Sequence, residues 1–167
     1  MELLYHVDKD DKVLGSIERD KAHATNALHR SGMVYLFNSK GELLIQHRSA
    51  EKKTFPSCYD MSCAFHITYG EKTEEAAKRE LIEETGVSDV PLTYIGKYSY
   101  NLPPENEIVH VFYCTSDKRI MIDPSESTGA EFVDLKEARR IVKEERTTPW
   151  FKDSWKMLED FLLKKSQ

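Results

Sequence analysis

Residues 71–87 read EKTEEAAKRELIEETGV, and this stretch decides the interpretation of the chain. Thr73 is a typical helix N-cap residue, and Gly86 can adopt the left-handed conformation that ends a helix. The two glutamates that follow Thr73 suit the positive end of the helix dipole. We therefore predict a helix from about Glu74 to Thr85.

Three glutamates fall on one face of this helix. Glu80, Glu83 and Glu84 stand at i, i+3 and i+4, so their side chains project within about 100° of arc. A solvated helix face is the simplest alternative. However, gathered carboxylates repel one another, whereas a hard cation such as Mg²⁺ prefers oxygen ligands and can bridge diphosphate oxygens. Arg79 precedes Glu83 by one turn, so it can hold that carboxylate or a neighbour in place.

Length, composition and charge limit the function classes. The chain has 167 residues, 40% of them hydrophobic, which allows one domain with a buried core. No apolar run could span a bilayer, and the N-terminal MELLYHVDKDD does not resemble a signal peptide, so we predict a cytoplasmic protein with no membrane partner. The net charge of −5 argues against binding a nucleic-acid polymer. The cysteines, Cys58, Cys63 and Cys114, suit a reducing compartment.

The remaining pattern predicts an α/β (α+β) fold, a mixed β-sheet flanked by helices. We expect strands at residues 3–7, 13–17, 32–38, 42–47, 60–68, 92–100 and 108–114, and further helices at 135–143 and 150–164. The first two strands form an N-terminal hairpin, and a polar loop at residues 101–107 separates the last two. A single domain is expected over residues 1–167, divided into a hairpin extension (1–29), a core (30–145) and a C-terminal helix (146–167).

The stretch from Glu71 to Val87 resembles the Nudix box, whose tail reads R-E-U-x-E-E-x-G-U, where U is apolar. The resemblance implies a Nudix fold and hydrolysis of a diphosphate linkage that depends on Mg²⁺, with Mn²⁺ as a substitute. It implies that Glu80, Glu83 and Glu84 are metal-binding and catalytic residues, with Glu83 or a glutamate outside the box as the general base. Three residues would support them: Arg79, Glu71 and Gly86.

One position departs from the Nudix box. The family's box opens with a glycine where this chain has Phe65, and Ala64 stands where a second glycine is common. In the family this region brings a backbone carbonyl toward the metal and closes around the substrate. The departure therefore predicts an altered pocket beside the metal.

Outside the box, most of the chain resembles the Nudix branch of isopentenyl diphosphate isomerases and their hydrolase relatives. The isomerases bind a divalent metal with three histidines and an E-x-E pair, which implies a similar site here from His23, His29, His66, Glu105 and Glu107. We take Glu105 and His66 as metal ligands and Glu107 as a further catalytic glutamate. The likeness also implies that Arg48, Lys52 and Tyr100 contact the substrate, although Arg48 and Lys52 could be ordinary surface charges.

The isomerases also require a cysteine two residues before the histidine that matches His66, and Ala64 stands there. Cys63 is one position away, and on an extended strand that offset points its side chain to the opposite face. We therefore favour hydrolysis of a nucleoside diphosphate or a derivative of one. The alternatives are an isopentenyl diphosphate isomerase and a binding module that senses a nucleotide without cleaving it. A homodimer is left open.

Overall fold

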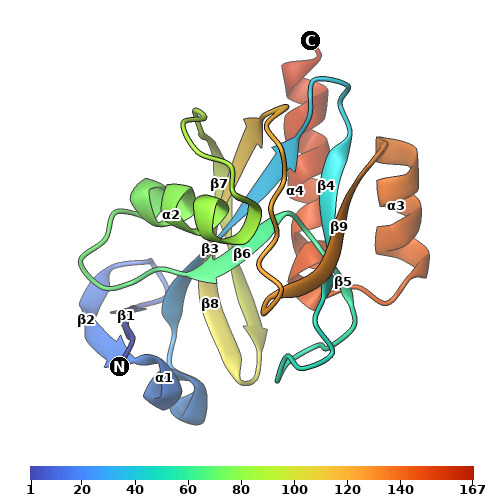
Figure 1. Ribbon diagram of the computed structural model, residues 1–167. Helices are drawn as coiled ribbons and strands as arrows, with labels where there is room; N and C mark the ends of the chain where they lie inside the picture. Colours follow the sequence, from blue (N-terminus) through green and yellow to red (C-terminus); the bar gives the residue numbers. More distant parts are fainter.

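The computed structural model describes residues 1–167 and contains a nine-stranded β-sheet with four helices around it (Figure 1). The strands are β1 (Leu3–Val7), β2 (Val13–Glu18), β3 (His29–Phe37), β4 (Leu43–Arg48), β5 (Tyr59–Asp60), β6 (Cys63–His66), β7 (Thr93–Leu102), β8 (Glu105–Thr115) and β9 (Ser127–Val133). The helices are α1 (Arg19–Thr25), α2 (Thr73–Thr85), α3 (Leu135–Glu144) and α4 (Pro149–Lys165). None of the helices has both the length and the apolar character needed to cross a membrane.

Strand β3 organises the sheet because it pairs with four other strands. It runs parallel to β8 and antiparallel to β6. It also meets β1 through His6 and His29, and β4 only through Phe37 and Leu43. Because β4 leaves β3 after that single pair, β4, β5 and β9 form a separate branch. The branch opens a gap between β4 and β6, which lie on the same side of β3.

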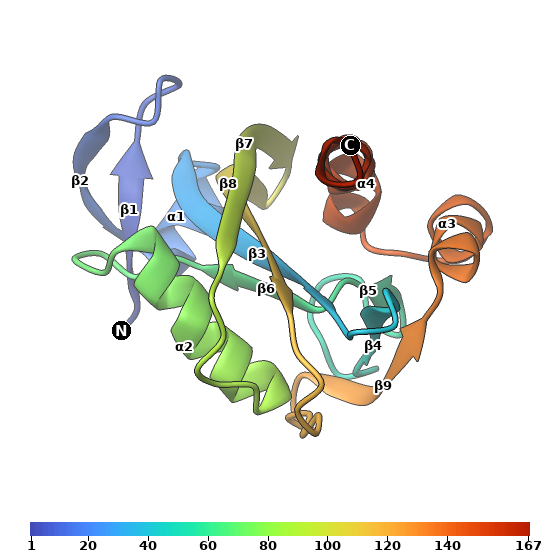
Figure 2. The same cartoon turned by 90° about the horizontal axis from the view of Figure 1, so that it is seen from above.

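Two hydrophobic clusters cover the two faces of the sheet, which Figure 2 shows between α2 and α4. Met33 and Tyr35 point toward α4, where they pack with Phe151. Val34 and Leu36 alternate with them and point toward α2. The predicted mixed sheet flanked by helices is therefore confirmed.

Helix α2 begins and ends close to the predicted residues. Thr73 is the first helical residue and Lys72 precedes it as the N-cap, so the prediction of Thr73 as the cap is wrong by one position. The reason is a backbone contact, since the N–H of Lys72 donates to the Glu75 carboxylate at 3.4 Å. Gly86 ends the helix with φ of 73°, and its N–H donates to the Ile82 carbonyl.

The predicted loop at residues 101–107 is wrong. Strands β7 and β8 pair to the tip of their hairpin, where Leu102 faces Glu105, and only Pro103-Pro104 form the turn. The polar composition reflects exposure at the tip rather than irregular backbone. Glu105, Asn106 and Glu107 therefore lie on a strand, with the two glutamates on the same face.

Three other elements differ from the sequence prediction. The predicted strand at 60–68 is divided into β5 and β6, because Asp60 and Cys63 pair with different strands. Helix α1 was not predicted, since Ala22 is its one buried residue and no apolar stripe marks it. Strand β9 was also missed because its sequence, STGAEFV, buries its two end residues and has no regular alternation.

A buried carboxylate fixes the N-terminal hairpin to the sheet. Asp11, in the β1–β2 turn, accepts hydrogen bonds from Arg30 at 2.6 Å and from Lys97 at 2.8 Å. The Nε2 atom of His110 lies 3.2 Å from the same carboxylate. These contacts join the hairpin to β3, β7 and β8. Burial alone would raise the pKa of Asp11, but Lys97 and Arg30 outweigh it and lower the pKa.

Replacing Asp11 with Asn is expected to lower the free energy of unfolding by about 1–3 kcal/mol at neutral pH, since hydrogen bonds to a charged group are lost. The native pKa lies below the usual 3.8, so the stabilisation is present above that value and lost as the pH falls through the native pKa. Thermal unfolding across pH should show the difference from wild type shrinking in acid. Asp10→Asn is the control, because the exposed side chain of Asp10 contacts only Lys9. A pH-independent difference contradicts this account.

Candidate active site

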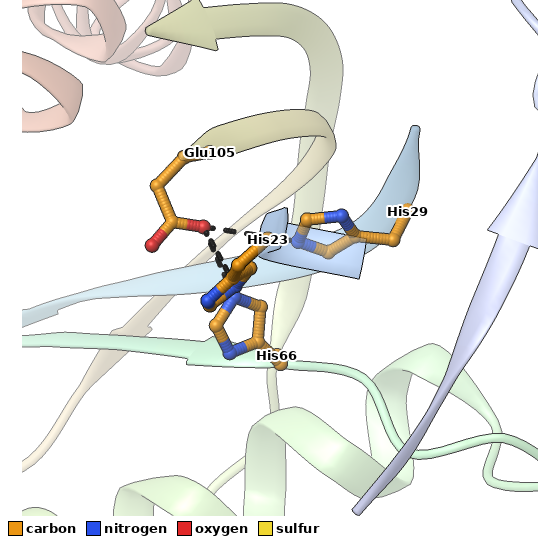
Figure 3. Close-up of side chains that lie close together, drawn as sticks. All are labelled: His23, His29, His66 and Glu105. Carbon is orange, nitrogen blue, oxygen red and sulfur yellow. Dashed lines mark hydrogen bonds and ion pairs between the residues drawn. The ribbon is translucent and has the colours of Figure 1, made fainter. Parts of the chain in front are cut away.

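Strand pairing gathers histidines and glutamates from distant parts of the sequence at one end of the sheet. His29 lies opposite Glu107 in the β3–β8 pair, and Ser31 lies opposite His66 in the β3–β6 pair. Glu105 is two residues before Glu107, so both side chains share a face. Helix α1 adds His23, whose ring lies beside those of His29 and His66, as Figure 3 shows.

The three imidazole rings converge on Glu105 (Figure 3). Its Oε2 atom lies 3.2 Å from His23 Nε2, 3.8 Å from His29 Nε2 and 3.4 Å from His66 Nε2. Ligand atoms of these four residues all lie within 4.8 Å of one another. Glu107 adds a second carboxylate, 3.1 Å from His66 Nε2 and 3.5 Å from His29 Nε2. We name these five residues the histidine cluster.

Neighbouring groups orient the cluster. His29 Nδ1 lies 2.8 Å from the Ala27 carbonyl, so Nδ1 carries the proton and Nε2 faces the cluster as an acceptor. Ser31 donates to Glu107 at 2.9 Å. Second-sphere contacts of this kind are typical of metal sites, where they fix the orientation of the ligands.

Two observations show that a divalent cation fits the histidine cluster. The Nε2 atoms of His23 and His29 are buried and lie near carboxylates without forming a hydrogen bond, which is costly unless something coordinates them. Burial alone would lower the pKa of His66, but hydrogen bonds to Glu105 and Glu107 raise it to about 9. The cluster therefore favours positive charge, which a metal ion would supply in place of a proton.

The predicted helix glutamates lie on α2, where Arg79 links three carboxylates. Its guanidinium donates to both oxygens of Glu71, each at 2.9 Å, and to Glu80 at 2.6 Å. Glu83 is 3.5 Å away, and its side chain is 57% exposed. Arg79 therefore holds Glu71 and Glu80 firmly, while Glu83 is free to reorient toward a ligand.

Glu84 points from the end of α2 into the gap between β4 and β6. The buried amide of Gln46 donates to it at 3.1 Å. Burial raises the pKa of Glu84 well above its usual value, and the charges of Asp60 and Glu80 raise it further. A buried carboxyl group among other carboxylates is a plausible ligand for a cation, which would relieve the repulsion.

A small polar pocket lies at this gap. It is lined by Gln46, Arg48, Asp60, Ala64, Glu84 and Glu126, and its volume of about 20 Å³ suits a water molecule or an ion. Ala64 connects the pocket to the histidine cluster, because His66 follows it by two residues on the same face of β6. Two residues of a strand span about 6–7 Å, so the two groups of candidate ligands adjoin one another.

The residues that replace the usual glycines lie on opposite faces of β6. Phe65 packs into the hydrophobic cluster on the α2 side of the sheet. Its ring covers Gly32, and a Cβ added at Gly32 would come within 2.6 Å of that ring. Ala64 lines the polar pocket. Cys63 is fully buried on the α2 side with Phe65, so its thiol does not reach the pocket.

The three residues predicted to contact the substrate differ in whether their polar atoms are free to bind a ligand. Arg48 lines the pocket, whereas Lys52 is engaged in an ion pair with Glu126. Tyr100 is buried beside Trp150, and its hydroxyl group has no partner. Arg48 and Tyr100 therefore present polar atoms near the candidate ligands, and Lys52 could do so only after leaving Glu126.

Gln46, Asp60 and Glu126 line the pocket but were not identified from the sequence. A polar residue inside the apolar run LLIQH was the available signal for Gln46. Asp60 and Glu126 stand in segments without a recognisable motif, and only the fold brings them to the gap.

The sequence matches the NUDIX domain family over residues 27–160. The chain belongs to the Nudix family. Among its Nudix relatives, an isopentenyl-diphosphate Delta-isomerase of Pectobacterium atrosepticum is 33% identical over 162 residues, which cover 93% of this chain and 90% of that protein. An uncharacterized Nudix hydrolase of Pseudomonas aeruginosa is 31% identical over 161 residues, covering 96% and 94%. The relatives thus include both an isomerase and a protein named as a hydrolase, the two kinds of protein in the predicted branch.

A solved structure shares this Nudix architecture. The crystal structure of DR0079 from Deinococcus radiodurans has a TM-score of 0.73 and 27% sequence identity, covering 88% of this chain and 93% of that one. The resemblance to the Nudix family, in the branch that contains isopentenyl diphosphate isomerases, is therefore confirmed.

Proposed function

We propose that this Nudix protein is a metal-dependent hydrolase that cleaves a diphosphate linkage in a small molecule. The observation that carries the proposal is the placement of Ala64 and Cys63. The pocket face of β6 carries a methyl group where the isomerase needs a thiol, while α2 retains its full set of glutamates. Nucleoside diphosphates and their derivatives are the first substrates to test.

Different side chains would bind the metal, accept the proton and bind the phosphate groups. Glu80 and Glu84 would hold a divalent cation, Mg²⁺ or Mn²⁺, and Arg79 keeps Glu80 in position. When bound, such a cation neutralises diphosphate oxygens and acidifies water. Glu83, which is exposed and weakly held, can accept the proton from the attacking water, and Glu107 is the second candidate for that role. Arg48 can pair with phosphate oxygens.

A panel of nucleotide, sugar and isoprenoid diphosphates, incubated with Mg²⁺ and followed by product analysis, tests the proposal. We expect release of a monophosphate or diphosphate product from at least one compound. Tight binding of a nucleotide without turnover would instead indicate a binding module.

Isomerisation of isopentenyl diphosphate is the second candidate, and the histidine cluster and the isomerase relatives favour it. It predicts uptake of deuterium from heavy water into the isopentenyl chain. We expect no uptake, because the side chain at position 64 cannot transfer a proton. Deuterium uptake by the purified protein would reverse this ranking.

Cys63→Ala separates the two candidates further. We expect unchanged turnover, because the thiol lies in the core on the far side of β6, and a loss of about 1 kcal/mol in stability from the small cavity. Steady-state kinetics and thermal unfolding measure the two effects. A loss of turnover with the fold intact would show that Cys63 reaches the substrate.

A further inference from the structure

The most heavily contacted buried charge near the pocket is Asp60, at the end of β5. Its Oδ1 atom accepts hydrogen bonds from its neighbour Met61 at 2.8 Å, from Thr148 at 2.8 Å and from the indole of Trp150 at 2.9 Å. Its Oδ2 atom accepts from Arg48 at 3.2 Å. Burial raises the pKa of Asp60, while Arg48 and the other three partners lower it. Three of the four contacts are N–H donors, one of them from a cation, so the geometry suits a carboxylate.

Arg48 is held on three sides. Besides Asp60, its guanidinium donates to the carbonyls of Phe55 at 3.1 Å and Thr54 at 2.9 Å. A guanidinium has five N–H bonds, so two remain for a ligand. Because Arg48 lines the same pocket as Glu84, these free donors adjoin the place where a metal-bridged diphosphate would lie.

Asp60 also holds Arg48 indirectly. The guanidinium carbon of Arg48 lies 5.2 Å from the centroid of the Trp150 ring, in a cation–π contact. The hydrogen bond from the Trp150 indole to Asp60 fixes that ring. One carboxylate therefore orients the guanidinium by direct pairing and by placing the aromatic surface on which it rests.

We propose that Asp60 is a positioning residue that sets the affinity of the pocket for a diphosphate group by orienting Arg48, without binding the diphosphate itself. The inference rests on the function proposed above for the same pocket. Both oxygens of Asp60 already accept hydrogen bonds from the protein, so Asp60 is placed to act through its partners. It links the first turn of α4 to the end of β4, which makes the position of Arg48 depend on how α4 is docked.

The test is a double-mutant cycle. The affinity for methylenediphosphonate with Mg²⁺, a diphosphate analogue that cannot be hydrolysed, is measured by calorimetry for wild type, Asp60→Asn, Arg48→Ala and the double variant. We expect each single variant to weaken binding about tenfold or more, since a hydrogen bond to a charged group is lost. The double variant should bind no more weakly than Arg48→Ala, because Asp60 acts through Arg48. The inference would be overturned if the fold-losses of affinity in the two single variants multiply in the double variant. It would also be overturned if Asp60→Asn binds the analogue as tightly as wild type.

Tyr35→Phe is the matched control. Tyr35 shares a buried hydrogen bond with Ser154 of α4 and forms none with Asp60. It should lower the melting temperature without changing the affinity for the analogue. An equal loss of affinity in this variant would mean that Asp60 acts only through the general stability of α4, which overturns the inference.

Trp150→Phe covers the case in which Asp60→Asn does not fold. It retains an aromatic ring but removes the donor to Asp60 and part of the surface under Arg48, so binding should weaken about threefold. Unchanged binding would overturn the inference. Wild-type protein that does not bind the analogue would overturn it as well. Wild-type protein that binds the analogue yet hydrolyses none of the substrates would contradict the proposed hydrolase activity. The double-mutant cycle would then still decide the role of Asp60.

Discussion

Replacing Glu84 or Glu83 with Gln is expected to reduce Mg²⁺-dependent turnover by about 10²–10⁴-fold, because one change removes a metal ligand and the other the favoured general base. Each replacement preserves the shape of the side chain and removes its charge. Steady-state product release at saturating Mg²⁺ measures the effect. Glu74→Gln is the matched control on the same helix, since Glu74 is exposed and pairs only with Lys78.

The Glu84 variant should also differ in stability. Burial and the neighbouring charges of Asp60 and Glu80 raise the pKa of Glu84, so its ionised form is destabilising above the pKa of the unfolded chain. Without metal, Glu84→Gln should therefore unfold at a higher temperature than wild type at neutral pH. Added Mg²⁺ should raise the melting temperature of wild type more than that of the variant. Activity that survives both Gln replacements would remove α2 from the mechanism.

Glu105→Gln is expected to weaken divalent-metal binding at the histidine cluster by more than about 100-fold, since loss of a ligand exceeds the effect of losing a second-sphere contact. Glu105 is the residue that all three histidines approach. Competition with a chromophoric chelator, using Mn²⁺ or Zn²⁺, gives the affinity. Glu131→Gln is the control, because Glu131 also pairs with a histidine, His47, but lies outside the cluster. Equal metal affinities for Glu105→Gln and wild type would exclude the cluster as a metal site.

The features predicted best from the sequence are those that depend only on residues close together in the chain. The spacing of Glu80, Glu83 and Glu84 and the stop at Gly86 are local properties of one helix, so they could be read without the fold. The opposite orientation of Cys63 and Ala64 likewise follows from the two-residue period of a strand, and the structure places them as predicted.

Contacts between distant segments were harder to predict. The residues alone gave no reason to join His23, His29 and Glu105, and only the family resemblance suggested that they meet. The polar loop predicted around Glu105 shows the limit, because hydrogen bonding to the opposite strand outweighed a composition typical of loops. Asp60 was missed for a related reason, since its partners Arg48 and Trp150 come from separate elements.

Pairing of β3 with β8 and β6 has a consequence for how the metal site could form during folding. A shift of β8 by one residue would turn both of its glutamates to the α2 side of the sheet, away from His29 and His66. The histidine cluster would thus be complete only in the native alignment. A cation bound there would favour correctly aligned chains and hold the three strands together at this end of the sheet.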